Sequence, residues 1–189
     1  MSESAKHKSS SFTFGLWFCA IIILVSSIVI QISDNPLLNA YKSQNISSTK
    51  PYETFEQFYP FYLQEHRQKI TRQWHYLGTS LFFLYVLFNP TLLLPLSAGG
   101  LAAYAVIPFS RHLSGGLAEL IAFASVYFIS GKLLTNSYVK LLLPHLFGYG
   151  CSWIGHFGFE QNKPAAFIYP TFSFFGDIHM MYDAVMDLF

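Results

Sequence analysis

Long stretches without charged side chains constrain this fold more than any other feature of the sequence. Residues 14–32 and residues 76–110 contain no Asp, Glu, Lys or Arg. Only 11% of all residues are charged, whereas an ordinary soluble domain carries about 25%. A run of about 20 apolar residues is long enough to cross the hydrocarbon core of a membrane as a helix. The sequence therefore predicts an all-α protein that lies within a lipid bilayer.

The apolar region after Tyr76 is predicted to form four helices. We expect them at residues 76–88, 91–109, 117–134 and 138–159. Asn89 and Pro90 end the first helix, because proline cannot continue it, and the glycine-rich residues 111–116 form a turn after the second. Several of these helices are short for a perpendicular span, so shallow or re-entrant hairpins are left open.

Two aromatic segments flank these helices and are predicted to lie at the membrane interface. Residues 52–66 mix aromatic with acidic side chains, and Pro60 is expected to kink or divide this segment. The tail, residues 161–189, is also rich in aromatic residues. Such rings are enriched at the level of the lipid headgroups, which is why we place both segments there.

The chain is predicted to have four parts. Residues 1–13 form a polar tail, 14–32 a transmembrane anchor, 33–51 a linker and 52–189 a membrane-embedded domain. The apolar run of the anchor exceeds the roughly 7–15 residues of a signal-peptide core, which favours an uncleaved helix. The predicted fold is thus a multi-pass helical bundle with interfacial helices and an additional N-terminal anchor helix. Lysines flank the anchor on both sides, so the positive-inside rule leaves its orientation open.

Histidines concentrate where the apolar runs begin and end. Ionisable side chains at such places usually pair, bind a ligand or react, because leaving water is costly. His66 and His75 are nine residues apart, which puts them on opposite sides of an unbroken helix. They can converge only if the chain breaks between them. We expect a turn at residues 68–70, followed by a helix with Thr71 as its N-cap.

A second cluster closes the last apolar run. His156 and Glu160 are four residues apart and share one face of a helix, so they could bind one metal or form an ordinary hydrogen bond. His179 lies four residues before Asp183 and is either a further ligand or a surface residue, and His145 is left open. Three imidazoles and a carboxylate with open coordination positions suit Fe(II) or Zn(II).

Several functional classes lack support in this sequence. The net charge is +1 and no large basic cluster occurs, which argues against nucleic acid as a partner. No Walker loop, dinucleotide fingerprint or Gly-x-Ser-x-Gly elbow is found, so nucleotide and acyl-serine chemistry are not expected. The repeated histidine boxes of membrane desaturases are missing too. Cys19 and Cys151 form no CxxC pair and are interpreted as small buried residues.

Two spaced motifs resemble those of the 2-hydroxy fatty acid dioxygenases, whose fungal member acts in fatty-acid α-oxidation at the endoplasmic reticulum. They are Tyr62-Leu63-Gln64-Glu65-His66 with Thr71-Arg72-Gln73-Trp74-His75-Tyr76-Leu77-Gly78, and Gly155-His156-Phe157-Gly158-Phe159-Glu160-Gln161-Asn162-Lys163-Pro164-Ala165. Further matches are Tyr169-Pro170, Gly176-Asp177 and Met180. The sequence departs from the family pattern at Thr71, where Asn is expected, and at His179, where members often carry a basic residue.

The resemblance implies an enzyme that uses Fe(II) and O2 to remove C1 from a 2-hydroxy fatty acid. The ligands that it implies are His66, His75 and His156, with Glu160 as a ligand or as a residue that orients one, and we add His179 as a further candidate ligand. Arg72, or Lys163 in its place, would pair with the substrate carboxylate. These predicted site residues are Arg72, Glu160, His66, His75, His156 and His179.

Three other functions compete with this interpretation. The histidines could hold helix ends together in a non-enzymatic membrane scaffold, or bind zinc in a lipid hydrolase. A transporter is disfavoured, because only Glu119 and Lys132 place charges in the middle of the apolar runs. The expected location is the endoplasmic reticulum in a eukaryote or the inner membrane in a bacterium. A homo-oligomer is left open.

Overall fold

The computed structural model describes residues 50–187, and these form helices without a β-strand. The all-α prediction is therefore confirmed for this part of the chain. The anchor predicted at residues 14–32 and nearly all of the linker lie outside the described residues. The six α-helices are α3 (Phe55–Gln64), α4 (Lys69–Phe88), α5 (Leu93–Ser110), α6 (Leu117–Thr135), α7 (Tyr138–Trp153) and α8 (Pro170–Met186). Three short segments complete them: the 3-10 helices η1 (Pro90–Leu92) and η3 (Ala165–Phe167), and the π-helix η2 (Ile154–Glu160).

The chain divides into two compact units, and the first contains α5 and α6. Within it, a Cβ on Gly99 would lie 3.0 Å from the ring of Phe123, so the two helices pack closely at this point. The segments Pro90–Ser110 and Leu117–Thr135 are each long and apolar enough to cross a membrane. In the most apolar 18 residues of each segment, only 33% of the first and 22% of the second are buried. A core helix of a soluble protein would be mostly buried. These helices therefore present apolar side chains outward.

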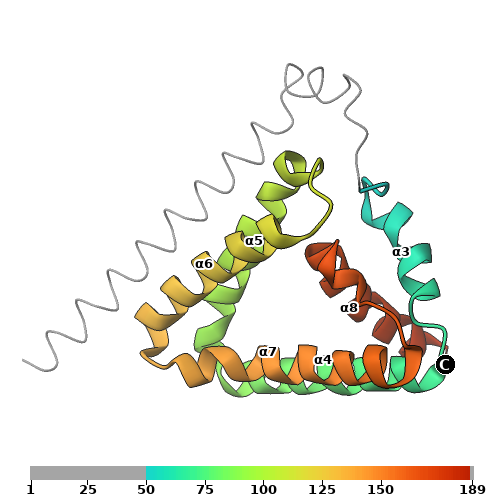
Figure 1. Cartoon of the computed structure of the whole chain (residues 1–189). Helices are drawn as coiled ribbons and strands as arrows, with labels where there is room; N and C mark the ends of the chain where they lie inside the picture. Colours follow the sequence, from blue (N-terminus) through green and yellow to red (C-terminus); the bar gives the residue numbers. More distant parts are fainter. Residues whose placement is uncertain (1–49, 188–189) are drawn as a thin grey trace, which may run out of the picture. The chain divides into compact units, whose positions relative to one another are not determined.

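The second unit contains α3, α4, α8 and the C-terminal part of α7. In Figure 1, α4 runs alongside that part of α7, and a Cβ on Gly78 would lie 2.9 Å from the Cβ of Cys151. Aromatic rings fill the space between α3 and α8. The ring centroid of Phe58 lies 5.0 Å from that of Tyr169 and 5.6 Å from that of Phe172. This packing holds α8 beside α3, which ends two residues before His66.

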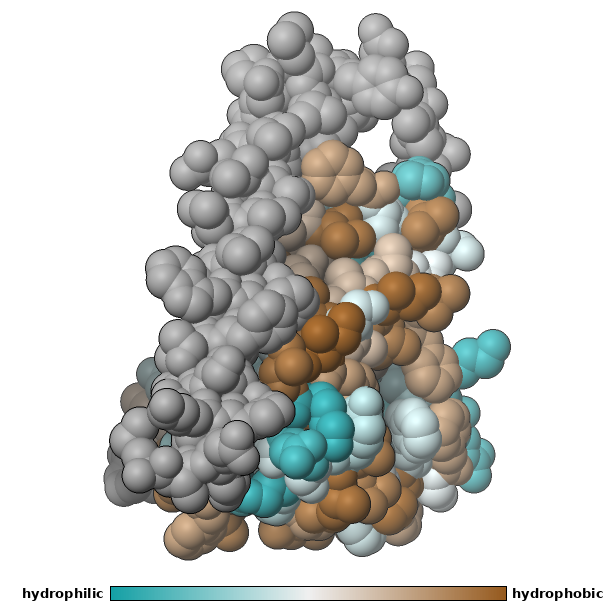
Figure 2. All heavy atoms as spheres, turned by 90° about the vertical axis from the view of Figure 1, so that its left-hand side faces the viewer, coloured by the Kyte–Doolittle hydropathy of each residue, from teal (hydrophilic) through white to brown (hydrophobic). Residues whose placement is uncertain are grey.

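Large apolar side chains are also exposed on the second unit. Leu87 and Phe88 at the end of α4 are 73% and 75% exposed, and Trp153 on α7 is exposed as well. Figure 2 shows the face that lies on the left of Figure 1, where hydrophobic residues cover much of the area that is not drawn in grey, beside hydrophilic ones. Large contiguous patches of exposed apolar surface are uncommon on soluble monomers.

Two details of the local structure differ from the sequence prediction. Of the kink or division predicted at Pro60, the structure excludes the division, because α3 continues through this residue as one helix. The prediction of Thr71 as an N-cap is wrong, since α4 begins at Lys69 with Gln68 as its N-cap and no capping bond from the Gln68 side chain. The carboxylate of Glu160 accepts hydrogen bonds from the neighbouring backbone instead. The predicted break between His66 and His75 is confirmed, but it lies at residues 65–68.

Candidate metal centre

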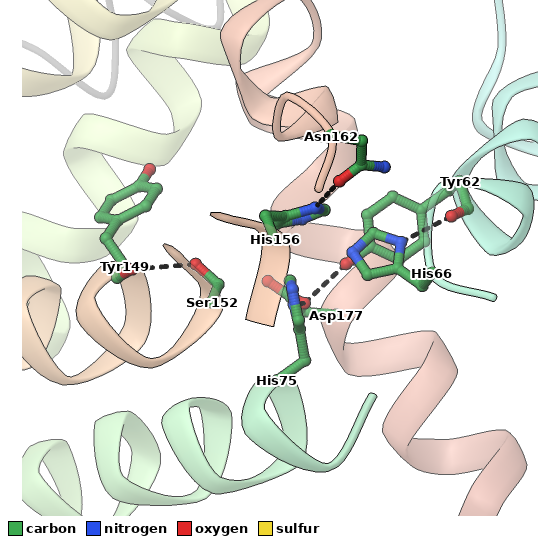
Figure 3. Close-up of polar contacts among 8 residues, drawn as sticks. All are labelled: Tyr62, His66, His75, Tyr149, Ser152, His156, Asn162 and Asp177. Atoms are coloured by element: carbon green, nitrogen blue, oxygen red, sulfur yellow. Dashed lines mark hydrogen bonds and ion pairs between the residues drawn. The ribbon is translucent and has the colours of Figure 1, made fainter. Parts of the chain in front are cut away.

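Three histidines from separate elements meet in the second unit. His66 lies in the turn after α3, His75 on α4 and His156 in η2. Their ring centroids are 4.4 to 5.0 Å apart, and one possible ligand atom of each lies within 4.8 Å of the others. All three side chains are at least 96% buried. Figure 3 shows the three rings pointing toward one another. We call this group the histidine triad.

Local backbone geometry brings the triad together. The turn at residues 65–68 separates α3 from α4, so His66 and His75 lie on different elements and their rings meet instead of pointing to opposite sides of one helix. The last apolar run, predicted as one helix to residue 159, changes at Ile154 into a π-helix, a rare form that is frequent at functional sites. Gly155 lets this π-helix approach α4, because a Cβ there would lie 3.2 Å from Cγ2 of Thr71. His156 is thereby placed beside His75.

Each histidine has an oxygen acceptor at Nδ1. His66 Nδ1 lies 2.6 Å from the Tyr62 carbonyl, His75 Nδ1 lies 2.5 Å from Oδ1 of Asp177, and His156 Nδ1 lies 2.7 Å from the side-chain carbonyl of an asparagine described below. An acceptor at Nδ1 requires the proton on that nitrogen, and the lone pair of a neutral ring is then on Nε2. Metal-binding histidines show this arrangement, in which the second nitrogen is fixed by a hydrogen bond.

The asparagine that orients His156 is itself held in place. Asn162 Nδ2 donates to both the backbone carbonyl and the carboxylate of Glu65, each at 2.9 Å. These two acceptors fix the amide, so its oxygen faces His156. Gln161, with a φ of 58°, adopts the left-handed conformation that ends η2 and turns the chain back toward the triad.

The triad fits a metal ion. Nε2 of His66 and Nε2 of His75 are buried and have no hydrogen-bond partner among the described residues, a costly arrangement for polar atoms unless something binds them. Burial and the nearby His75 ring lower the pKa of His66 to about 3, and burial lowers the pKa of His156 as well. These two imidazoles are therefore neutral at physiological pH. Neutral imidazoles that converge on one point are the preferred donors for zinc, iron and similar ions.

Comparison with known proteins identifies the family. The family model described as 2-hydroxy-palmitic acid dioxygenase Mpo1-like matches residues 52–188. The chain belongs to this family. The match covers both motifs and the complete histidine triad, so the resemblance predicted from the motifs is confirmed. No curated protein and no solved structure matches the chain.

Two predicted site residues of this Mpo1-like chain contact the backbone beside the triad. Glu160 accepts hydrogen bonds from the backbone N–H groups of Arg67 and Gln68, both at 3.0 Å, and thereby holds the start of α4 against η2. Its carboxylate is not among the converging ligand atoms. Arg72 donates from Nε to the carbonyl of His66 at 2.6 Å. Both residues support the turn that carries His66.

Two other predicted histidines lie apart from the triad. His179 is 47% exposed, and its Nδ1 lies 3.2 Å from Asp183 one turn further along α8. The structure therefore does not bring His179 into the group of possible ligands. His145, which the sequence left open, is also outside that group. Its ring packs against Phe82 on α4, with a centroid distance of 6.2 Å, and its burial lowers its pKa to about 4.

The sequence analysis missed the carboxylate of the centre in this Mpo1-like chain. Asp177 on α8 accepts hydrogen bonds from Nδ1 of His75 and, at 2.6 Å, from the hydroxyl of Tyr62. Burial would raise the pKa of Asp177, but the neighbouring His75 ring and these two hydrogen bonds lower it below its ordinary value. The residue was noted as part of a family motif without a role. No local pattern marks it, because its partner His75 is 102 residues away.

Proposed function

We propose that this chain is an Fe(II)- and O2-dependent dioxygenase that shortens a 2-hydroxy fatty acid by one carbon. Membership of the 2-hydroxy-palmitic acid dioxygenase family supports the substrate class. The observation that carries the metal assignment is the buried histidine triad, with Nδ1 of each ring occupied and two Nε2 atoms left for a ligand. Three protein ligands leave coordination positions open, as an oxygenase requires.

The protein's part in this reaction is to hold and shield the reacting groups. His66, His75 and His156 would bind ferrous iron, which supplies O2 activation and Lewis acidity to the site. The Tyr62 carbonyl and the Asn162 amide fix the ring orientation of two ligands. Burial of all three rings excludes bulk water, which strengthens electrostatic interactions in the site.

Arg72 is our proposed partner for the substrate carboxylate. A guanidinium has five N–H donors, and the Nε group of Arg72 is bonded to the His66 carbonyl. The remaining donors therefore belong to a side chain that is anchored beside the first ligand. Guanidinium–carboxylate pairs are strong and directional, so this contact would also orient C1 and C2 of the substrate.

Glu160 is proposed to act through the ligands. Its two hydrogen bonds to the backbone at Arg67 and Gln68 connect η2, which carries His156, with the turn that carries His66. A carboxylate used in this way keeps two ligands at a constant separation. We therefore propose Glu160 as a positioning residue.

The substrate of the proposed reaction is a lipid, and we propose that the enzyme is an integral, multi-pass membrane protein. Two apolar helices, α5 and α6, support this location because most of their apolar side chains are not buried within the protein. The segment 14–32 is proposed to add an N-terminal anchor. A eukaryotic host would place the enzyme in the endoplasmic reticulum and a bacterial host in the inner membrane.

The direct test is reconstitution of the full chain in detergent with Fe(II) under anaerobic conditions. O2 and 2-hydroxypalmitate are then added, and the products are identified by mass spectrometry. The proposal expects the fatty acid one carbon shorter, formed only when both iron and O2 are present. Iron-loaded, folded protein without this product would contradict the proposed reaction.

The same experiment separates the two alternatives. Three histidines also form a well-known zinc site, so bound zinc with turnover of lipid esters in the absence of O2 would favour a hydrolase. Folded protein that binds neither metal would favour a scaffold, in which the triad serves only packing.

A further inference from the structure

Asp177 occupies a distinct place among the groups that orient the triad. Its Oδ1 accepts from Nδ1 of His75 at 2.5 Å and from the hydroxyl of Tyr62 at 2.6 Å. The acceptors of the other two histidines are a backbone carbonyl and an amide oxygen, which are neutral. Asp177 is therefore the charged acceptor among the three, and its side chain is 27% exposed. Figure 3 shows its carboxylate beside the ring of His75, with a dashed line to the Tyr62 side chain.

Tyr62 connects this carboxylate with a second ligand. Its hydroxyl bonds to Asp177, its backbone carbonyl accepts from His66, and its ring centroid lies 4.1 Å from that of His66. The side chain is 1% exposed. One buried tyrosine thus joins α3 and α8 and contacts one ligand directly and another through Asp177.

We infer that Asp177 is a positioning residue of the metal centre, which orients His75 and offsets the charge of the bound cation. Three neutral imidazoles around a divalent ion leave two positive charges in a buried site, and uncompensated buried charge is strongly unfavourable. The carboxylate supplies a negative charge one ring away from the ion. A carboxylate at Nδ1 also increases the basicity of the imidazole and so its affinity for the metal.

The geometry assigns an indirect role to Asp177. Its Oδ1 faces Nδ1 of His75, and the two nitrogens of an imidazole ring point in different directions. Nε2 of His75 is the atom that is left for the metal. Asp177 consequently acts through the ring of His75 and does not compete with it as a ligand.

Cobalt(II) binding tests this inference without relying on turnover. The full chain in detergent is titrated with Co²⁺, the affinity is measured by competition with a chelator, and the visible d–d spectrum reports the ligand field. Asp177→Asn keeps the size and one oxygen acceptor but removes the charge, and Asp177→Ala removes both. We expect Co²⁺ affinity to fall about 10-fold in Asp177→Asn and about 100-fold in Asp177→Ala, the range for residues that orient metal ligands. Both variants should have altered d–d bands.

Asp183→Asn is the matched control. Asp183 lies on the same helix and also accepts from a tyrosine and a histidine, but neither belongs to the triad. Its substitution should change Co²⁺ affinity by no more than about twofold, because the Asp183 side chain is 41% exposed and its partners lie outside the triad.

The possible results separate this inference from the proposed function on which it rests. Wild-type protein that binds Co²⁺, together with unchanged affinity and spectrum in Asp177→Asn and Asp177→Ala, overturns the role of Asp177 and leaves the metal site intact. Wild-type protein that binds no Co²⁺ overturns the metal site and the role of Asp177 together. If Asp177→Ala shows no thermal unfolding transition and is therefore unfolded, the Co²⁺ affinity and d–d spectrum of Asp177→Asn decide alone.

Discussion

Helices α3 and α8 carry two tyrosine–aspartate–histidine clusters that share their chemistry and differ in their surroundings. The inner cluster consists of Tyr62, Asp177 and His75. Its histidine comes from a third helix, α4, and is 4% exposed. Because Nδ1 of His75 is bound to the carboxylate, its Nε2 is directed into the buried centre, where it has no partner among the described residues.

The outer cluster consists of Tyr59, Asp183 and His179. Tyr59 donates to Asp183 at 2.5 Å, much as Tyr62 does to Asp177. Its histidine, however, lies four residues before the aspartate on the same helix and is 47% exposed. A carboxylate that bonds to a histidine of its own helix fixes a surface side chain, whereas one that bonds across helices can hold a buried ligand. Residue type alone therefore does not distinguish a metal centre from a surface ion pair.

The largest expected difference between the two clusters is in their histidines. His75→Ala should lower metal affinity and dioxygenase activity by more than about 100-fold, which exceeds the usual effect of changing an orienting residue. His179→Ala should stay within about twofold of wild type, as expected for an exposed position. Bound metal is measured by mass spectrometry and activity by the yield of the shortened acid.

Folding must be unchanged for this comparison to hold. Circular dichroism of His75→Ala should retain the helical signal of the wild type. The substitution removes Nε2 of His75, a buried nitrogen that has no hydrogen-bond partner among the described residues. A fully active His75→Ala protein with its metal retained would exclude His75 as a ligand. A metal-free His179→Ala protein would instead place the outer cluster at the metal centre.

A smaller effect is expected at the amide that orients the third ligand. Asn162→Ala leaves Nδ1 of His156 without its acceptor and should weaken metal binding about 10-fold. Glu65→Gln should have a milder effect, since Asn162 keeps its hydrogen bond to the Glu65 backbone. Asn89→Ala is the control, because Asn89 donates to a helix carbonyl at the end of α4. Equal metal affinities of Asn162→Ala and Asn89→Ala would contradict an orienting role for Asn162.

The three histidines of the triad could be predicted from sequence, whereas Asp177, the carboxylate that orients His75, could not. The spacing of His66 and His75 required a break, and the structure has one. By contrast, His179 and Asp183 have the helical spacing that suggests a paired site, and Asp177 has no such neighbour. Spacing rules detect partners within one helix, but the carboxylate of the inner cluster is 102 residues from its histidine. Contacts between residues so far apart in sequence depend on how the helices pack.

The ends of helices were likewise predictable where local residues set them and not where a distant residue does. The α5 and α6 ends agree with the predicted ranges 91–109 and 117–134 within two residues, because Pro90 and Gly116 interrupt the apolar pattern locally. The predicted N-cap of α4, Thr71, lies three residues after the observed N-cap, Gln68. The N–H groups of Arg67 and Gln68, directly before the helix, are bound by the Glu160 carboxylate, which is 93 and 92 residues away, and no local capping signal can indicate such a contact.

A substitution at Gly176 tests whether the inner cluster is tightly packed, and we expect it to lower the free energy of unfolding by about 1 kcal/mol. A Cβ at this position would lie 3.0 Å from three ring atoms of Tyr62. Overpacking of this kind usually costs about 1–3 kcal/mol, which outweighs the gain of up to about 1 kcal/mol from alanine in a helix. Gly176→Ala should therefore lower the free energy of unfolding and weaken metal binding.

Gly148→Ala provides the control for this substitution. No atom lies within 4 Å of a Cβ at Gly148, which is also inside a helix, so alanine there should be neutral or slightly stabilising. Denaturant unfolding of both variants gives the comparison. A Gly176→Ala protein as stable as Gly148→Ala would mean that the Tyr62 ring moves freely, and that the inner cluster is not rigid.

The smallest effect is expected at Glu160, whose carboxylate, unlike that of Asp177, accepts from the backbone N–H groups of Arg67 and Gln68. Burial raises the pKa of Glu160, yet the hydrogen bonds from Gln68, Thr71 and Arg67 lower it below its usual value of 4.5. Because the folded-state pKa is lowered, the ionised group stabilises the fold above pH 4.5, and this contribution is lost as the pH falls through the folded-state pKa. Glu160→Gln should thus be about 0.5–1 kcal/mol less stable at neutral pH, the usual range for capping groups. Thermal unfolding across this pH range should show the difference from wild type shrinking in acid, whereas a difference that is independent of pH would assign the effect to shape instead of charge.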